Sequence, residues 1–216
     1  MFLYHSEGNT FFKNKEYEKA IEKYTEAIAL DPSDVTFFSN RSACYAALNK
    51  WNEAADDGKQ CIIVDKSFVK GYFRHALGLQ NLGNLDGAIE SVKRGLGIES
   101  TNADLKKMSK ELEEALRLKR VDGSITQADA QMASNDIMGA YRTIEAALRL
   151  DPTNDRLNSQ MSKVKPKYEQ LEKQRIAGLD PKERLKEEGD SHFKNASFEK
   201  AIVSYTKCLD SISDKV

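Results

Sequence analysis

The sequence predicts an all-α protein, an α-solenoid of helical hairpins closed by capping helices. Alanine recurs every 34 residues at Ala20, Ala54 and Ala88, each time three residues after an apolar side chain. Small residues occupy a later column of the same pattern, as close packing between helices requires. These are Ala27, Cys61, Gly95, Ala147 and Cys208. With 40% hydrophobic residues and 4 prolines, the chain can bury a continuous core.

The first half is expected to form three hairpins. Polar or glycine-containing pairs at Asn14-Lys15, Asn49-Lys50 and Gly83-Asn84 mark the turn inside each hairpin. The repeat period and these turns predict six helices. Their expected ranges are 3–14, 17–30, 35–48, 51–64, 69–82 and 85–98.

A further helix is expected after Thr101 or Asn102, either of which can cap it. Its apolar residues lie on one face and should cover the open side of the third hairpin. They are Leu105, Met108, Leu112 and Leu116. The stretch from Lys119 to Ser124 contains Asp122-Gly123, and we expect it to be a joint between two parts of the chain.

The second half predicts a degenerate fourth repeat, with Ile137 and Ala140 in the repeat columns, that ends near Asn154. The helical pattern over 155–177 contains Pro166, which should kink or break it. Asp180-Pro181 is a strong helix start, and a last hairpin should run to about 211. The expected domains are therefore 1–120, 121–178 and 179–216. The open edge of the last hairpin suggests either a longer protein or a covering partner.

The composition excludes several function classes. The formal net charge of −1 argues against a nucleic-acid or membrane-surface role. No run of eighteen apolar residues or signal peptide is present, so we expect a cytoplasmic protein. The cysteines Cys44, Cys61 and Cys208 lie far apart in the sequence, which favours buried thiols over disulfides or a metal site.

The three histidines lack partners at catalytic or ligand spacing, so we expect no enzyme activity, no metal and no cofactor.

Polar residues on the first helix of each hairpin indicate a binding groove. His5 and Asn9 are four residues apart, as are Lys70 and Arg74, so each pair shares one helix face. Asn40 lies on the first helix of the hairpin between them. Because these helices line the concave wall of a solenoid, the five side chains should converge on one patch.

Three segments with these residues resemble the tetratricopeptide co-chaperones, most of all the amino-terminal domain of the heat-shock organising protein. They are Gly8-Asn9 with Phe11 and Phe12, the run 39–45, and the run 70–74. The resemblance covers about residues 1–118. It implies a carboxylate clamp for the terminal Glu-Glu-Val-Asp of the 70-kDa or 90-kDa chaperones. It also implies that Phe12, Ala43 and Ala46 form an apolar floor for the penultimate valine.

The residue types fit a peptide end with two carboxylates. Lysine and arginine supply charge, while asparagine amides donate hydrogen bonds without adding charge. Asparagine is also a poor helix former, so Asn9 and Asn40 need a reason to lie inside helices. The family has a lysine where this chain has His5. Because an ordinary histidine has a pKa of about 6.5, we expect weaker binding than for a lysine clamp, and stronger binding as the pH falls towards 6.

Other functions remain open from the sequence alone. The groove of a scaffold can bind internal segments of another protein, and such modules also target phosphatases or prolyl isomerases. A second protein partner for residues 121–216 is expected, but nothing in the sequence names it. The last hairpin carries Lys186 at the first clamp position, but Asp190 where asparagine is required. A second clamp or a structural role are the two interpretations of that pattern.

Overall fold

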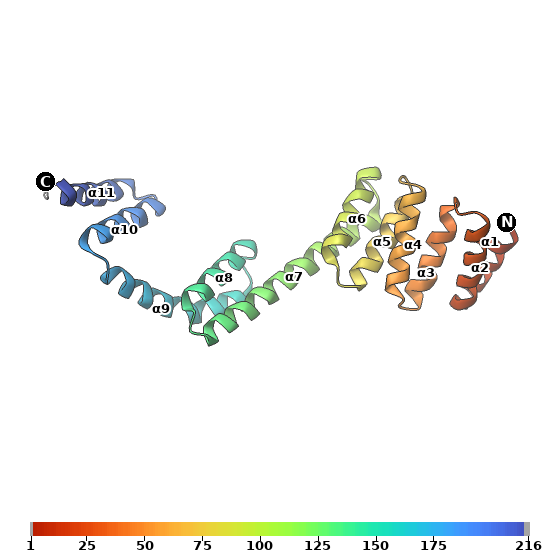
Figure 1. The fold of residues 1–216 in the computed structure, drawn as a ribbon, viewed down its shortest axis with the longest axis horizontal. Coiled ribbons are helices and arrows are strands. Elements are labelled where there is room, and N and C mark those ends of the chain that lie inside the picture. Colours follow the sequence, from red (N-terminus) through yellow and green to blue (C-terminus); the bar gives the residue numbers. More distant parts are fainter. Residues whose placement is uncertain (1, 214–216) are drawn as a thin grey trace. The chain divides into compact units, whose positions relative to one another are not determined.

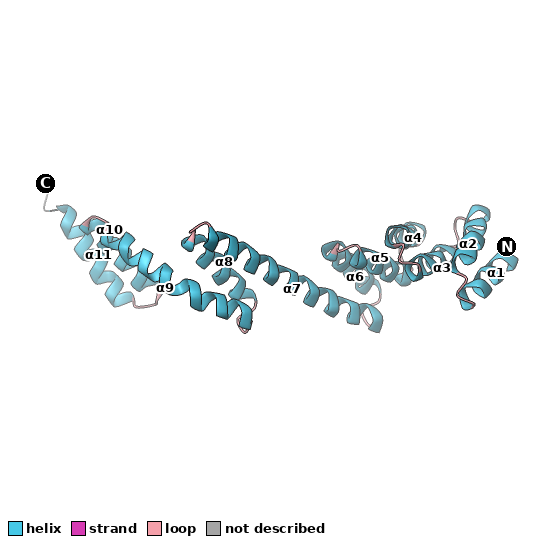
Figure 2. Ribbon diagram, turned by 90° about the horizontal axis from the view of Figure 1, so that it is seen from below, coloured by secondary structure: helices cyan, strands magenta, loops and turns pink. Residues whose placement is uncertain are grey.

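The computed structural model describes the backbone of residues 2–213 and the side chains of residues 6–211. Over this range the regular structure consists of eleven α-helices without a β-strand (Figures 1 and 2). The predicted all-α class is therefore confirmed. The chain divides into two compact units, residues 1–119 and 120–216.

The first unit begins with three helical hairpins, as the repeat period predicts. Five of the six expected helix starts coincide with those in the structure, the first helix starts one residue early, and all six expected ends agree to within one residue. The helices are α1 (Phe2–Lys13), α2 (Tyr17–Leu30), α3 (Val35–Ala47), α4 (Trp51–Val64), α5 (Val69–Asn81) and α6 (Leu85–Ile98). The turns within the hairpins contain Lys15, Asn49 and Gly83 at positive φ, 62°, 57° and 77°. These left-handed residues reverse the chain between antiparallel helices.

Small residues allow the helices of neighbouring hairpins to approach closely. A side chain on Gly58 of α4 would collide with the backbone of His75 on α5, and one on Gly78 of α5 would meet the backbone of Ala55. Gly71 lies against the β-carbon of Cys61 in the same way. The position of α5, which carries Lys70 and Arg74, therefore depends on glycines at the α4–α5 contact.

Helix α7 (Ala103–Ala133) is longer than the sequence predicts. Its side-chain cap is Asn102, which accepts a hydrogen bond from the backbone nitrogen of Leu105 at 3.0 Å. Leu105, Met108 and Leu112 pack against the third hairpin, as expected of a covering helix. The stretch from Lys119 to Ser124 contains no turn, because α7 continues through it, but the boundary between the two units falls there, between residues 119 and 120. Gly123 costs about 1 kcal/mol inside this helix. The buried apolar residues of α7 on both sides of it offset that cost.

The second unit contains the rest of α7 with α8 (Ile137–Leu150), α9 (Asp155–Ala177), α10 (Pro181–Lys194) and α11 (Phe198–Ser213). Its core joins α7, α8 and α9 through a cluster of buried side chains. Among its members are Ile125, Ile137, Ile144, Leu157 and Val164. Ile137 and Ala140 are buried, as their repeat columns predict.

The chain does not break at Pro166, where the sequence predicts a kink or a break. Helix α9 is continuous from Asp155 to Ala177 with Pro166 inside it. Proline removes the hydrogen bond to the carbonyl four residues earlier, that of Ser162. Both Pro166 and Ser162 are exposed, so water can satisfy that carbonyl.

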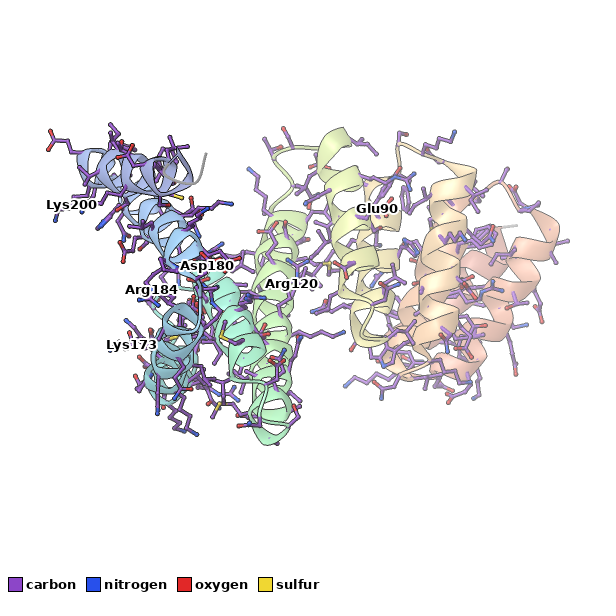
Figure 3. The ribbon with its side chains drawn as sticks, turned by 60° about the vertical axis from the view of Figure 1, so that its left-hand side comes forward. Glu90, Arg120, Lys173, Asp180, Arg184 and Lys200 are labelled. Atoms are coloured by element: carbon purple, nitrogen blue, oxygen red, sulfur yellow. The ribbon has the colours of Figure 1, made fainter. Side chains whose placement is uncertain are left out.

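The turn from α9 to α10 is fixed by two side chains (Figure 3). Asp180 accepts hydrogen bonds from the backbone nitrogens of Lys182 and Glu183, at 2.8 and 3.0 Å. Arg184 donates back to the carbonyls of Ala177 and Leu179. The helix start predicted at Asp180-Pro181 is therefore confirmed.

Candidate carboxylate-binding groove

Two asparagines from different hairpins meet in the first unit. Asn40 Nδ2 on α3 donates to Asn9 Oδ1 on α1 at 3.4 Å, and the Tyr24 hydroxyl on α2 donates to the same oxygen at 2.7 Å. The Tyr24 ring is buried, and a side chain on Gly8 would collide with it. These bonds orient the Asn9 amide with its oxygen inwards, so its nitrogen is the atom that can donate to a ligand.

Lys70 and Arg74 lie one turn apart on α5. Burial lowers the pKa of both groups, and for Lys70 the charge of Arg74 lowers it further. The Nε of Arg74 is buried and has no hydrogen-bond partner. Within the described side chains neither cation forms an ion pair. Helix α5 therefore holds two partly desolvated positive charges without a counterion among the described residues, an arrangement that a bound anion would stabilise.

Arg41, which lies beside Asn40 in the sequence, shows the opposite situation. Its guanidinium donates to both carboxylate oxygens of Asp57 at 2.8 Å and to the Thr25 hydroxyl at 2.9 Å. The pair is largely buried between α3 and α4. Arg41 therefore joins neighbouring hairpins, while Arg74 keeps a donor without an acceptor.

The remaining predicted residues are placed only in part. His5 belongs to α1, but its side chain lies outside the described residues. Ala43 and Ala46 are half-buried on α3 and follow Asn40 in the sequence. Phe12 is 37% exposed, and its ring meets Tyr17 edge-on with centroids 5.7 Å apart. The structure places Phe12 near the end of α1, where it packs on its own hairpin.

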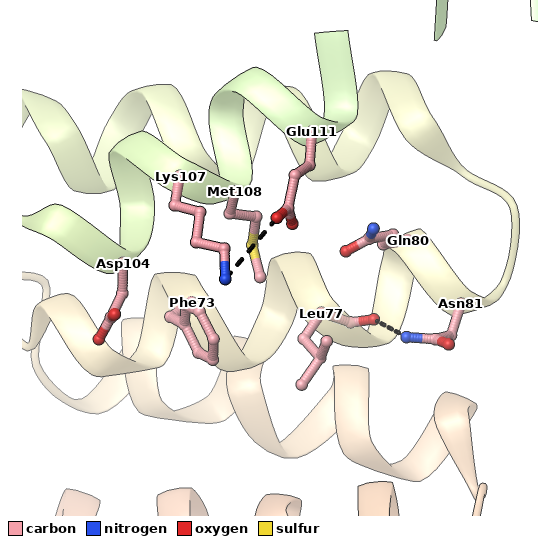
Figure 4. A pocket seen from close by; sticks show the side chains of 8 residues that line it. All are labelled: Phe73, Leu77, Gln80, Asn81, Asp104, Lys107, Met108 and Glu111. Carbon is pink, nitrogen blue, oxygen red and sulfur yellow. Dashed lines mark hydrogen bonds and ion pairs between the residues drawn. The ribbon is translucent and has the colours of Figure 1, made fainter. Parts of the chain in front are cut away.

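A cleft beside Lys70 and Arg74 was missed by the sequence reasoning. Its volume is about 390 Å³, and Phe73, Glu99 and Asp104 also line it. A second cleft of about 350 Å³ follows α5 between Phe73, Leu77 and Met108 (Figure 4). From the sequence, α7 is expected only to cover the third hairpin. The 34-residue repeat does not indicate that Asp104 lines a cleft with Arg74.

The described residues contain no group of three or more His, Cys, Asp or Glu side chains that could hold a metal ion. No described helix is both long and apolar enough to cross a bilayer.

Comparison with known proteins identifies the repeat. A family model described as TPR repeat matches residues 8–49. The second TPR domain of human RPAP3, solved in complex with the HSP70 peptide SGPTIEEVD, is 32% identical to this chain. The match covers 51% of this chain and 92% of that domain, with a TM-score of 0.50. The chain belongs to the TPR repeat family.

Two relatives of this TPR chain come from Saccharomyces cerevisiae. Small glutamine-rich tetratricopeptide repeat-containing protein 2 is 34% identical over 120 residues, which are 53% of this chain and 35% of the relative. Heat shock protein STI1 is 40% identical over 101 residues, 46% of this chain and 17% of the relative. The chain thus spans about a third or less of the length of these relatives.

Proposed function

We propose that this protein is a co-chaperone adaptor whose first unit captures the carboxyl-terminal Glu-Glu-Val-Asp tail of heat-shock chaperones of the 70-kDa or 90-kDa class. The observation that carries the proposal is the pair Lys70 and Arg74, two cations on one wall without a counterion among the described residues. We add to them, as further donors, the amides of Asn9 and Asn40, which are bonded to each other across α1 and α3. Such a donor set suits a residue that carries two carboxylates.

The comparisons support the same ligand class. The RPAP3 domain that resembles this chain holds a peptide ending in Glu-Glu-Val-Asp, and the relatives include a heat shock protein. We assign His5, Asn9, Asn40, Lys70 and Arg74 to the clamp, and Phe12, Ala43 and Ala46 to its apolar floor. Four or five charge-assisted bonds at roughly 1.5–3 kcal/mol each, less the cost of association, correspond to a Kd of about 1 μM.

In this proposal the protein is a cytoplasmic adaptor without catalytic activity. Residues 1–120 form the clamp domain, and 121–178 with 179–216 serve a second protein partner. Reversible capture suits this role, because an adaptor must release one chaperone to engage the next.

Calorimetric titration of the whole chain tests the assignment. A nonapeptide that ends in a free Glu-Glu-Val-Asp should bind one to one. The same peptide with an amidated end should bind at least tenfold more weakly, because one carboxylate is gone. Lys70→Ala should reduce binding, whereas Lys93→Ala, at an exposed lysine of α6, should not.

Two outcomes would favour the other functions. Equal binding of the free and amidated peptides would indicate a groove for internal segments. If neither form binds, the clamp assignment fails, and phosphatase or isomerase assays on the full-length protein become the next test.

A further inference from the structure

The two clefts beside α5 form one continuous channel. The cleft at Lys70 and Arg74 and the cleft between α5 and α7 share Phe73 and Asp104 in their linings. From the two cations the open surface therefore continues along α5 as far as Asn81, with α7 as its other wall (Figure 4). Both walls belong to the first unit. We call this surface the α5–α7 channel, and a ligand held at the cations has room to extend along it.

The length of the α5–α7 channel matches a short extended peptide. Lys70 and Asn81 lie eleven positions apart on one helix, which corresponds to a rise of about 16 Å. An extended peptide advances about 3.3 Å per residue, so five steps back from its last residue cover the same distance. A peptide whose last residue is held at Lys70 and Arg74 therefore brings its sixth residue from the end to the far end of the channel.

Helix α7 runs beside α5 in the same direction. Asp104, near the start of α7, lines the cleft at Lys70, whereas Glu111 lines the cleft that reaches Asn81. Lys107 lies between the two acids in the sequence and lines the same cleft as Glu111. The ammonium group of Lys107 is therefore in the middle of the channel, and the carboxylate of Glu111 is at its far end.

The charges along the α5–α7 channel change sign from one end to the other. The near end holds the cations Lys70 and Arg74, and the far end holds the carboxylate of Glu111. A peptide with carboxylates at its last residue and a cation several residues earlier has the complementary distribution. An acidic residue at that earlier position would be repelled instead.

Lys107 and Glu111 are only weakly paired with each other. Their charged atoms are 3.9 Å apart, and their side chains are 78% and 55% exposed (Figure 4). Exposed pairs one helical turn apart contribute little to stability. A ligand that offers a carboxylate to Lys107 and a cation to Glu111 therefore replaces this pair at little cost.

We propose that Lys107 and Glu111 form a specificity site, which selects tails with a lysine or arginine at the sixth residue from the end, two places before Glu-Glu-Val-Asp. In the bound state Lys107 pairs with a glutamate of the tail, and Glu111 pairs with the tail's cation. This inference rests on the proposed function, because the site acts on a peptide whose last residue is already held at Lys70 and Arg74.

Three nonapeptides with free carboxyl ends test the selection. The first is Ser-Gly-Gly-Arg-Ala-Glu-Glu-Val-Asp, and the second has glutamine in place of arginine. The third, Ser-Arg-Gly-Gln-Ala-Glu-Glu-Val-Asp, keeps the net charge of the first but moves the arginine. Calorimetric titration of the whole chain at low salt should show binding of the first peptide about threefold tighter than that of the other two. High salt should reduce this difference, because it screens exposed charges.

Substitutions on α7 assign the selection to its residues. Glu111→Gln should remove the preference for the first peptide and leave the affinity for the second unchanged. Glu113→Gln is the matched control, because this exposed glutamate of α7 lines neither cleft, and the preference should persist. Lys107→Ala should weaken all three peptides by a similar factor. All three substituted residues are exposed, so the fold should persist.

Failure of the specificity site and failure of the clamp give different results. Equal binding of the three peptides, or a preference that Glu111→Gln leaves intact, would overturn the specificity site while the clamp stands. If Lys70→Ala leaves binding of the second peptide unchanged, the clamp itself fails. Absence of binding by all three peptides would overturn both.

Discussion

Asn40 on α3 and Asn9 on α1 lie in hydrogen-bond contact at 3.4 Å although 31 residues separate them in the sequence. Tyr24 holds the shared oxygen from the opposite side at 2.7 Å. Two neighbouring hairpins are therefore connected by polar side chains, although apolar packing alone could join them. The cations Lys70 and Arg74 lie on α5, the first helix of the next hairpin.

Removal of the Tyr24 hydroxyl should weaken tail binding without abolishing it. Tyr24→Phe keeps the buried ring but releases the Asn9 amide, so the donor nitrogen is no longer oriented. We expect about a fivefold rise in the Kd of the tail peptide, and about tenfold for Asn40→Ala, measured by calorimetry. Tyr205→Phe, the equivalent change in α11, is the matched control. A similar effect of Tyr205→Phe would argue against the Asn9 assignment.

Arg74→Met should separate binding from stability. The substitution keeps the apolar contacts of the side chain and removes a buried donor that lacks an acceptor. Tail binding should fall at least tenfold, while the thermal midpoint of the ligand-free protein stays the same or rises. A large fall in the midpoint would show that Arg74 is needed for the fold.

Arg41→Met, unlike Arg74→Met, should lower the stability of the folded protein. It leaves the buried carboxylate of Asp57 without its partner, which typically costs about 3–5 kcal/mol. Arg117→Met, at an exposed pair with Glu114, should cost about 0–1 kcal/mol. Trp51 is the single tryptophan and lies on α4, so its fluorescence during urea unfolding reports on the first unit. Equal costs for the two substitutions would contradict the structural role of Arg41.

His75 should make the first unit less stable in mild acid. Burial, together with the charges of Lys59 and Arg94, lowers the pKa of His75 in the folded chain. The unfolded chain therefore takes up the proton first, and stability is lost as the pH falls below about 6.5. The urea midpoint of Trp51 fluorescence should fall between pH 7.5 and pH 5.5. His75→Asn should reduce that fall, and an unchanged pH dependence would exclude His75 as its source.

His5→Lys should strengthen tail binding at pH 7.5. A lysine carries its positive charge at this pH, whereas an ordinary histidine is mostly neutral. The difference in Kd between the two proteins should narrow at pH 6, where histidine becomes charged. Calorimetry at both pH values measures it, and equal affinities at pH 7.5 would mean that position 5 does not contact the tail.

Local signals determined how much of the fold the sequence could predict. Turn residues such as Asn49 and Gly83 and caps such as Asn102 and Asp180 act within a few positions, so the helix boundaries near them were predicted correctly. The helices continue through Gly123 and Pro166 for a different reason. Each residue disfavours a helix locally, but packing of the flanking apolar residues into the shared cores outweighs that preference.

The candidate site was likewise predictable only where local sequence patterns specify it. Spacing along one helix places Lys70 and Arg74 together, and the repeat period places Asn9 and Asn40 on the first helices of neighbouring hairpins. The acidic side chains Glu99 and Asp104, which line the same cleft as Arg74, come from a segment outside the repeat period, so no sequence pattern could relate them to that cleft. The bond from Tyr24 to Asn9 depends on packing between two helices, which the sequence does not specify.

Arg74 has no ion-pair partner among the described residues, so under the proposed function the lifetime of the protein depends on its ligand. A peptide that neutralises Arg74 at a concentration 100 times its Kd would add about 2.7 kcal/mol to the free energy of unfolding. Proteases that attack the open form would then act roughly a hundred times more slowly on the occupied protein. Under the proposed function, the supply of chaperone tails would itself regulate how much of this adaptor a cell retains.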